Sequence, residues 1–375
     1  MQLIKVLHIL DSLNCGGAEV MTLDVCRNAK ANGLDLTFLA TGGGDLEEDF
    51  RRSGFDFLRL KRRLPLDLGL AAQIRRIVQE RKIQVVHGHQ PVEALHLYLA
   101  TRNSGIKRVL TTHGVVSGAK NELALQFVIP RTDGLVAISR DLLNWLKKGR
   151  SYNTSRSVSL INNGVDFKRL QSRVGNLHNE LNLPAEARLI GMVANFRPGM
   201  EKDQLTVCRA LPRLFAAVPG SHFVFAGGRS EEAPHLFDDC VRYCHEQQIS
   251  ERVHFLGKRS DVGDVLASLD VFVLSSRSEG SPISVIEAMM MGVPTVLSDI
   301  RSLHEVSDNA RCALLFRAGD SEDLAVKLIQ LLNNSEQRVR LGLRAQKWAF
   351  EKFSIEQHIS NLAQFYFSLM KKSFR

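Results

Sequence analysis

The strongest constraint on the fold is an alternation of short apolar runs with longer amphipathic stretches, which occurs twice along the chain. Runs that are apolar on both faces and separated by helical stretches are typical of a buried parallel sheet. The sequence therefore predicts the α/β class, with two Rossmann-like domains that face a central cleft. In the first half the runs are Ile4–Leu10, Leu34–Ala40, Phe55–Leu60, Val85–His87, Arg108–Thr112, Leu135–Ile138 and Val158–Ile161. In the second half they are Leu189–Ala194, His222–Ala226, Val253–Leu256, Val271–Leu274, Thr295–Leu297 and Ala313–Phe316.

A polar segment between the two series of strands predicts the domain boundary. Residues 171–188 contain Gly, Pro and several Asn and show no strong periodicity, as expected of a connection between domains. We expect an N-terminal domain at 1–175, a C-terminal domain at 176–355 and a final helix at 356–375. A length of 375 residues also favours two domains of ordinary size.

Positive charge is concentrated in the first half of the chain. Residues 1–170 carry 25 Lys and Arg against 16 Asp and Glu, whereas the remaining residues carry 24 of each. This asymmetry predicts an anionic partner for the N-terminal domain, such as a phospholipid surface or a pyrophosphate-linked acceptor. No nucleic-acid-binding motif accompanies the charge, so we expect no nucleic acid partner.

Apolar runs and cysteines predict the compartment. No run approaches the roughly 18–20 residues of a membrane-spanning helix, and Lys5 interrupts the N-terminal apolar stretch before a signal sequence could form. The six cysteines are scattered, which favours free thiols. Cys240 and Cys244 have the spacing of one helix face, and no second pair follows to complete a zinc site. We expect a cytoplasmic protein without a metal ion.

The segment from Ser275 to Asp299 carries the most specific chemistry. A strand ends before it, and Ser281 and Pro282 have the residue types of an N-cap and a first helical position. The free N–H groups of the first helical turn attract a phosphate. Glu279 before the helix and Glu287 within it can each accept hydrogen bonds from hydroxyl groups. This pattern suits a nucleotide sugar, although an ordinary surface loop and helix would also explain two glutamates.

Further candidate residues follow other predicted strands. Arg197 and Lys202 come after the first strand of the second half and could neutralise a pyrophosphate. In the first half, Gly16 and Gly17 begin a helix and let the backbone approach a phosphate. The pattern G-x-G-x-x-G is absent, which disfavours a dehydrogenase. Histidines also end two strands of this half, at positions 87, 89 and 113.

Taken in order, these motifs resemble the retaining glycosyltransferases of family 4, also called group 1. The similarity runs nearly end to end, and its most specific part is two glutamates eight positions apart, followed by Gly-x-Pro and Ser-Asp. The matching segments are GGAE at Gly16–Glu19, THG at Thr112–Gly114, VAIS at Val136–Ser139, INNGVD at Ile161–Asp166, Arg197 with Lys202, EGSPISVIEAMMMG at Glu279–Gly292 and GVPTVLSD at Gly292–Asp299.

The resemblance implies a GT-B fold in which the second domain holds the donor and the last helix crosses back to the first domain. It implies no cofactor and no metal ion, in agreement with the lack of an Asp-x-Asp pair after a strand. The implied donor site comprises Glu287 on the ribose, Glu279 on the sugar, Arg197 and Lys202 on the diphosphate, Gly280, Ser281, Pro282 and Ile283 at the helix start, Gly16 and Gly17 near the phosphate, and His113 near the reacting carbon.

The activity that the resemblance implies is retaining transfer of a hexose-like sugar from a nucleotide sugar, with UDP the commonest nucleotide. The acceptor would be a glycan or a lipid-linked molecule in the synthesis of cell-surface polysaccharide, lipopolysaccharide or glycolipid. Three alternatives remain open from the sequence: a sugar-nucleotide epimerase on the same fold, a pyridoxal-dependent phosphorylase, and a non-catalytic subunit that binds nucleotide sugars.

A basic segment of the N-terminal domain predicts peripheral contact with the inner face of a membrane. Arg59–Pro65 is basic, and Leu68–Lys82 combines apolar positions with four cations. Such a helix could dock on anionic lipid. It could equally be an ordinary helix that packs on the core and exposes a solvated basic face.

Overall fold

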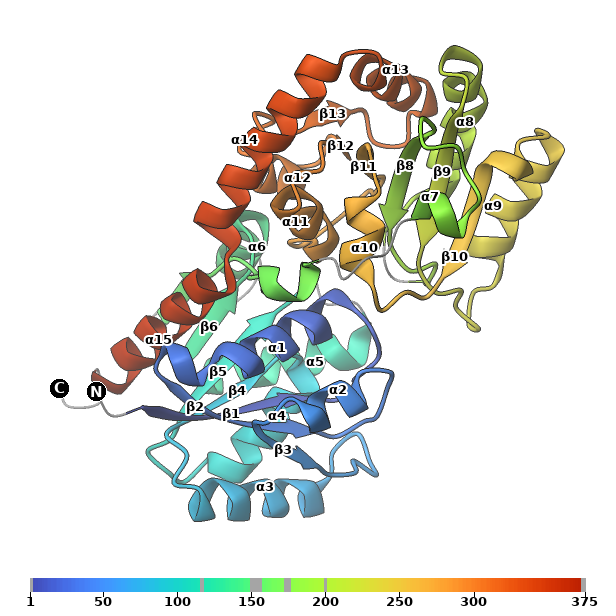
Figure 1. Ribbon diagram of the computed structural model, residues 1–375. Helices are drawn as coiled ribbons and strands as arrows, with labels where there is room; N and C mark the ends of the chain where they lie inside the picture. The colour runs from blue at the N-terminus through green and yellow to red at the C-terminus, as the bar shows by residue number, and fades with distance from the viewer. Residues whose placement is uncertain (1–2, 115–117, 149–156, 172–176, 199–200, 372–375) are drawn as a thin grey trace. The chain divides into compact units, whose positions relative to one another are not determined.

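The computed structural model describes residues 3–114, 118–148, 157–171, 177–198 and 201–371. The chain divides into two compact units, one of Met1–Val165 with Phe353–Arg375 and one of Asp166–Lys352 (Figure 1). The expected boundary between 175 and 176 lies outside the described residues, and the contacts divide the chain after Val165 instead. The reason is a 3₁₀ turn, η3 at Phe167–Leu170, which packs on helices of the second unit.

The first unit contains a seven-stranded parallel sheet in the order β3-β2-β1-β4-β5-β6-β7. The sheet lies between helices (Figure 1). Its strands are β1 (Ile4–Leu10), β2 (Leu34–Ala40), β3 (Asp56–Arg59), β4 (Val85–Gly88), β5 (Lys107–Thr112), β6 (Gly134–Ala137) and β7 (Ser157–Leu160). Its helices are α1 (Gly17–Asn28), α2 (Glu47–Arg52), α3 (Leu68–Glu80), α4 (Pro91–Thr101), α5 (Ala119–Val128), α6 (Arg140–Lys148) and α15 (Ile355–Lys371), with 3₁₀ turns η1 (Lys30–Asn32) and η2 (Ile129–Arg131).

Alternation along β1 divides its side chains between the two faces of the sheet. Leu7 and Ile9 join Leu70 and Ile74 of α3 in one hydrophobic cluster, whereas His8 lies between them in sequence and contacts residues of the opposite face. The apolar side of α3 is therefore part of the core. This favours the interpretation of α3 as a helix that packs on the core, because Leu70, Ile74 and Val78 are buried and not available to a membrane, whereas Leu68 at its start is exposed.

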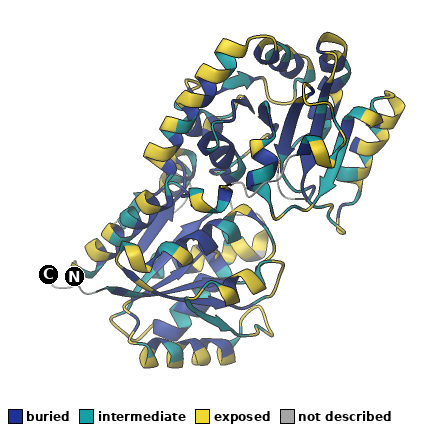
Figure 2. Cartoon of the chain, viewed as in Figure 1, coloured by how far each residue is buried: buried dark blue, intermediate teal, exposed yellow. Residues whose placement is uncertain are grey.

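The second unit contains a six-stranded parallel sheet in the order β10-β9-β8-β11-β12-β13, so both predicted Rossmann-like sheets are confirmed. Its central strands are mostly buried, its edge strands are partly exposed, and the outer faces of its helices are exposed (Figure 2). The strands are β8 (Arg188–Val193), β9 (Ser221–Ala226), β10 (Val253–Gly257), β11 (Val271–Leu274), β12 (Thr295–Ser298) and β13 (Leu314–Phe316). The helices are α7 (Leu177–Glu180), α8 (Gln204–Ala217), α9 (His235–Glu246), α10 (Val262–Ala267), α11 (Ile283–Met290), α12 (Arg301–Val306), α13 (Ser321–Leu332) and α14 (Ser335–Phe353), with the 3₁₀ turn η4 (Ser250–Arg252). Within the described ranges, no helix is both long enough and apolar enough to cross a membrane.

The last helix, α15, returns to the first unit, as expected, and contacts α1 and β5. Two glycines permit its close approach. A Cβ atom on Gly134 of β6 would lie 2.7 Å from the ring of Phe365, and one on Gly164 would lie 2.6 Å from the Cβ atom of His358. The glycine of the INNGVD segment therefore has a packing function against α15.

Histidines are buried where α15 meets the sheet. His358 donates a hydrogen bond from Nδ1 to the carbonyl oxygen of Asn162 at 2.7 Å. Burial lowers the pKa of His358 to about 4, and burial, with a smaller contribution from His358, lowers the pKa of His8 to about 3. Both side chains are therefore neutral in the folded protein at neutral pH.

We expect the first unit to lose stability as the pH falls from about 6.5 toward 4. Over this range the unfolded chain binds protons that the folded chain excludes, so each buried histidine lowers the free energy of unfolding by up to about 1.4 kcal/mol per pH unit. The measurement is urea unfolding at pH 7.5, 6 and 5. A Trp348→Phe background leaves Trp145 of α6 as the tryptophan that reports on the first unit.

The variant His358→Gln should reduce the change of unfolding free energy with pH by about the contribution of one buried histidine. His245→Gln, at an exposed position of α9 in the second unit, is the matched control and should keep the wild-type slope. Unfolding free energies of the first unit that do not change between pH 7.5 and 5 would contradict the neutral state of the buried histidines.

Candidate active site

The order of strands in the second sheet reverses between β8 and β11, which is where open parallel sheets bind ligands. The segments that follow these two strands are joined by backbone hydrogen bonds. The amide of Asp203 donates to the carbonyl of Ser275 at 2.9 Å, and the amide of Arg277 donates to the carbonyl of Glu201 at 2.8 Å. Two segments that are distant in sequence therefore form one surface at this point.

Lys202 and Glu279 form an ion pair across these two segments. Their side chains are only 7% and 8% exposed. Because a buried charge without a partner is strongly destabilising, each of these groups requires the other while no ligand is bound. The structure thus brings together a cation that the sequence predicted for the diphosphate and a carboxylate that it predicted for the sugar.

Arg197 lies on the same segment as Lys202 and is partly exposed. Its neighbour Phe196 is buried and forms backbone hydrogen bonds with Gly228 and Ser230, at 2.9 Å each, which position this segment against the loop after β9. A Cβ atom on Gly227 would lie 2.0 Å from the carbonyl oxygen of Ala194. Gly227 therefore allows close approach of the loop that carries Arg197.

Helix α11 follows Glu279 and begins one residue later than expected. Pro282 occupies the N-cap position and Ile283 is the first helical residue, so the prediction of Ser281 as the N-cap was wrong. No side chain caps this helix. The backbone N–H groups of its first turn therefore remain available for an anion, next to Gly280 and the buried Ser281.

Glu287 lies inside α11, buried, and its carboxylate accepts a hydrogen bond from Arg169 at 2.5 Å. Arg169 belongs to η3, which begins after Asp166, a residue whose side chain accepts from the amide of Lys168 at 3.0 Å. Sequence reasoning missed Arg169. The available signal was the need for a cation beside a glutamate in an apolar helix.

The first sheet reverses its strand order between β1 and β4. Gly16 is the extended N-cap of α1 and Gly17 is its first residue, and no side chain caps this helix either. The loop after β2 packs tightly on the loop after β1, since a Cβ atom on Gly42 would lie 1.8 Å from the carbonyl oxygen of Asp11. The predicted phosphate-binding glycines thus begin a helix, and the loop that precedes this helix packs against the loop after β2.

A buried glutamate that the sequence did not indicate joins the two loops at this reversal. The carboxylate oxygens of Glu93, in α4, accept hydrogen bonds from the amide of Asp11 at 2.7 Å and from the amide of His89 at 2.9 Å. Burial, and then the nearby Asp11, raise the pKa of Glu93 well above its usual value. Glu93 therefore fixes the backbone after β1 relative to the backbone after β4.

His113 follows β5 and is half-buried, with its Nε2 atom 2.9 Å from Nδ1 of His89. Burial lowers the pKa of His113 to about 4. Behind it, nitrogen atoms of His8, His87 and His89 lie within 4.8 Å of one another, a group that could hold a metal ion. His113, Gly16 and Gly17 belong to the first unit, and the other predicted site residues belong to the second.

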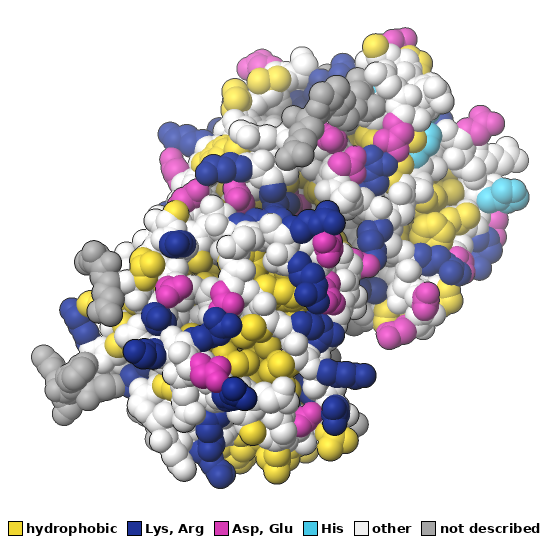
Figure 3. Space-filling view, turned by 60° about the horizontal axis from the view of Figure 1, so that its bottom comes forward, with side chains coloured by type: hydrophobic (Ala, Val, Ile, Leu, Met, Phe, Trp, Pro, Cys, Tyr) yellow, Lys and Arg dark blue, Asp and Glu magenta, His cyan; other side chains and the backbone are white. Residues whose placement is uncertain are grey.

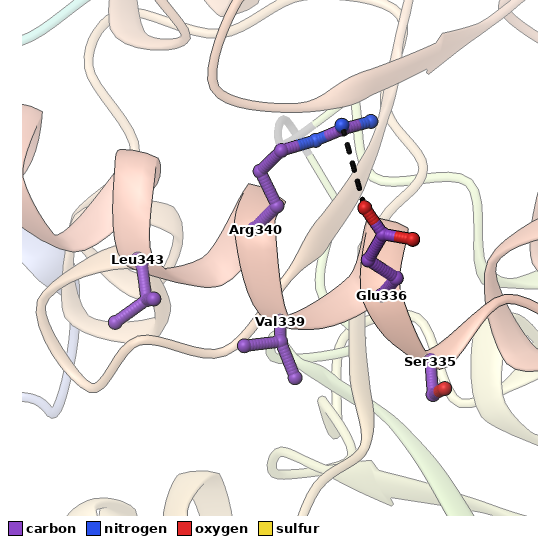
Figure 4. Close-up of a pocket in the computed structure, with 5 residues that line it drawn as sticks. All are labelled: Ser335, Glu336, Val339, Arg340 and Leu343. Atoms are coloured by element: carbon purple, nitrogen blue, oxygen red, sulfur yellow. Dashed lines mark ion pairs between the residues drawn. The ribbon is translucent and has the colours of Figure 1, made fainter.

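A surface depression of about 490 Å³ lies elsewhere, on α14. Ser335, Glu336, Val339, Arg340 and Leu343 line it, and Glu336 and Arg340 form an ion pair at 4.0 Å (Figure 4). None of the predicted site residues is among those that line it. The sequence-predicted chemistry is therefore located at the strand ends rather than in this depression.

Two family models match the chain, one on each half. The model described as Glycosyltransferase Family 4 matches residues 15–169, and the model described as Glycosyl transferases group 1 matches residues 187–334. These matches include every predicted site residue.

Relatives extend the similarity along the whole chain. N-acetyl-alpha-D-glucosaminyl L-malate synthase of Bacillus anthracis is 26% identical over 82% of this chain and 80% of its own length. A UDP-Gal:alpha-D-GlcNAc-diphosphoundecaprenol alpha-1,3-galactosyltransferase of Escherichia coli is 21% identical over 98% of this chain and 97% of its own.

The crystal structure of HepE from Anabaena in complex with UDP and glucose has the same fold, with a TM-score of 0.85 and 18% identity over 97% of this chain and 100% of that chain. Both halves of the chain match family models, and the two sheets have the expected GT-B architecture. The chain is therefore an enzyme of the family 4, or group 1, glycosyltransferases.

Proposed function

We propose that this protein transfers a sugar from a UDP-linked donor to a glycan or lipid-linked acceptor, with retention of configuration and without a metal ion. The observation that carries the proposal is the buried Lys202–Glu279 pair, which lies where the second sheet reverses its strand order. A site that already holds one cation and one carboxylate in contact can receive a ligand that combines an anionic diphosphate with a hydroxyl-rich sugar.

The donor would occupy the carboxyl ends of β8 and β11. Arg197, Lys202 and the uncapped first turn of α11 would hold the diphosphate, with Gly280, Ser281 and Pro282 leading into that turn. Glu287, positioned by Arg169, would accept hydrogen bonds from the ribose hydroxyls, and Glu279 would accept them from the sugar. Gly16, Gly17 and His113 of the first unit would complete the contacts to the phosphate and the sugar.

The names of relatives support the choice of donor and acceptor. The Escherichia coli relative is named for a UDP-Gal donor and a diphosphoundecaprenol-linked acceptor, and HepE was crystallised with UDP and glucose. We therefore propose a role in cell-surface polysaccharide or lipopolysaccharide synthesis, at the cytoplasmic face of a membrane.

In the proposed reaction, the bond between the anomeric carbon and the phosphate oxygen breaks, and the acceptor oxygen bonds to the same face of that carbon. The acceptor proton passes to the departing phosphate oxygen. Negative charge accumulates on the leaving diphosphate, so preorganised cations beside it lower the barrier. Arg197 and Lys202 would supply this stabilisation.

The primary test of donor binding is a thermal shift measured against a panel of nucleotide sugars. A donor that binds the folded protein at a hundredfold excess over its Kd stabilises it by about 2.7 kcal/mol. We expect a UDP-sugar to raise the Tm of the wild type and to raise that of Glu287→Gln much less, relative to each protein's own baseline.

The matched control for this test is Glu336→Gln, which changes an exposed carboxylate of the same unit. It should respond to the donor as the wild type does. If no nucleotide sugar shifts the Tm, or if Glu287→Gln responds as fully as the wild type, the proposed donor site is wrong.

Arg197→Ala should lower kcat at least roughly a hundredfold, by analogy with the removal of one oxyanion-stabilising donor. The assay is release of UDP in the presence of the acceptor, and Arg213→Ala, which removes an exposed cation of α8, is the control. Nearly wild-type turnover in Arg197→Ala would refute the assigned role. Conversion of the nucleotide sugar without any acceptor would identify an epimerase instead.

The first unit also has a surface suited to an anionic membrane. Leu64, Leu66 and Leu68 are 62%, 52% and 67% exposed, and the exposed cations Lys61 and Arg63 precede them in sequence. Lys and Arg side chains lie near exposed hydrophobic side chains on the face of this unit in Figure 3. Leucines that enter the interface beside cations that attract anionic lipid would bring the active site to a lipid-linked acceptor.

The double variant Leu64→Ser/Leu66→Ser should bind vesicles of anionic lipid at least about tenfold more weakly, because each leucine contributes on the order of 1.5 kcal/mol or more when buried in lipid. Co-sedimentation with vesicles of rising phosphatidylglycerol content measures this. Leu343→Ser, an exposed leucine of α14, is the control. Sedimentation that is independent of anionic lipid would remove the membrane from the proposal.

A further inference from the structure

Side chains of the first unit form one continuous chain of hydrogen bonds that ends at His113. Tyr366 comes from α15, and the other members come from β1, β4, β5 and the segments that follow β4 and β5. The successive distances are 2.7 Å from Thr111 Oγ1 to His87 Nε2, 2.5 Å from His87 Nδ1 to Tyr366 Oη, 3.0 Å from Tyr366 Oη to His8 Nε2, 3.1 Å from His8 Nδ1 to His89 Nε2, and 2.9 Å from His89 Nδ1 to His113 Nε2.

Every imidazole of this chain is neutral at neutral pH. Burial is the largest cause that lowers the pKa of His8 to about 3 and of His113 to about 4, and it holds the pKa of His87 and of His89 well below the usual value. A neutral imidazole has one N–H donor and one acceptor nitrogen. Imidazoles that are linked in series must therefore all donate in the same direction.

Two arrangements satisfy the whole chain, and they run in opposite directions. In one, the hydroxyl of Thr111 donates to His87 and the last N–H group of the chain is on Nδ1 of His113. In the other, His113 donates from Nε2 and Thr111 receives the last hydrogen bond. Any mixed arrangement leaves an N–H or O–H group of Tyr366 or a histidine without an acceptor.

The end at Thr111 decides between the two directions. Thr111 is buried, and within the described residues His87 is the hydrogen-bond partner of its hydroxyl. If Thr111 only accepted, its O–H group would be buried without an acceptor, whereas if it donates, only lone pairs stay unused. Orphaned buried donors cost more than unused acceptors, so the chain begins with donation by Thr111.

We infer that His113 carries its proton on Nδ1 and presents this N–H group as a hydrogen-bond donor toward the ligand. His8, His89 and Tyr366 are positioning residues, because the direction in which they donate hydrogen bonds sets this tautomer of His113. The proposal that the N–H group meets an oxygen of the donor sugar rests on the proposed function. In this state His113 binds an oxygen atom and does not act as a base toward it.

The ring geometry favours this chain over a metal site at the same histidines. The rings of His87 and His89 are stacked, with centroids 4.7 Å apart and an interplanar angle of 16°. Their in-plane lone pairs lie in nearly parallel planes and do not converge on one ion at the roughly 2.0–2.1 Å that a zinc–imidazole bond requires.

The direct test is two-bond ¹H–¹⁵N correlation NMR on the full chain, labelled with ¹⁵N only in histidine, at pH 7.5. His113→Gln assigns the resonances. We expect Nδ1 of His113 to have the shift of a protonated nitrogen and Nε2 that of an unprotonated one. The opposite tautomer, or stoichiometric metal in the purified protein, would overturn the inference.

Paired variants test whether the chain sets the tautomer. His89→Gln preserves it, because the glutamine oxygen can accept from His8 while its amide donates to Nε2 of His113. His89→Leu removes that donor, so His113 should show shifts averaged between the two tautomers. Unchanged His113 shifts in a folded His89→Leu protein would contradict the proposal.

Turnover measurements separate this inference from the proposed function. If both hold, kcat falls more in His89→Leu than in His89→Gln, with Glu336→Gln as a control that leaves turnover unchanged. If the NMR result holds but these variants have equal turnover, the hydrogen-bonded chain exists and the role of His113 toward the donor is wrong.

Discussion

The structure depends on one geometric constraint: in a parallel sheet, every strand delivers the chain to the same edge. Where the strand order reverses, between β1 and β4 and between β8 and β11, successive connections go to opposite faces and leave an opening at that edge. Both sets of predicted site residues follow strands at or next to these reversals. The glycines after β1 and the cations after β8 thus occupy equivalent places in two separate sheets.

The strands were predictable because their signal is local. A segment that is apolar on both faces has to be buried, and each of the two expected series of strands is found in one sheet. Most motif residues were also found from local spacing, including Glu279 and Glu287. The start of α11 was misplaced by one residue because Ser281 and Pro282 each suit a helix start, and only the backbone conformation decides between them.

Contacts between residues far apart in sequence could not be predicted. Arg169 lies 118 positions from Glu287, and Tyr366 lies 358 positions from His8. Nothing in the neighbourhood of either residue indicates its partner. In both cases the partner is a group that burial would otherwise leave unsatisfied, so the general requirement was known and the residue that meets it was not.

The return of α15 to the first unit has a consequence for how the chain folds during synthesis. The second unit is one continuous segment, Asp166–Lys352, and is complete as soon as that segment has been made. The first unit lacks Tyr366 and His358 until the segment that follows Lys352 has also been made. Of the two units, the one whose strands are made first is therefore the one that finishes folding last.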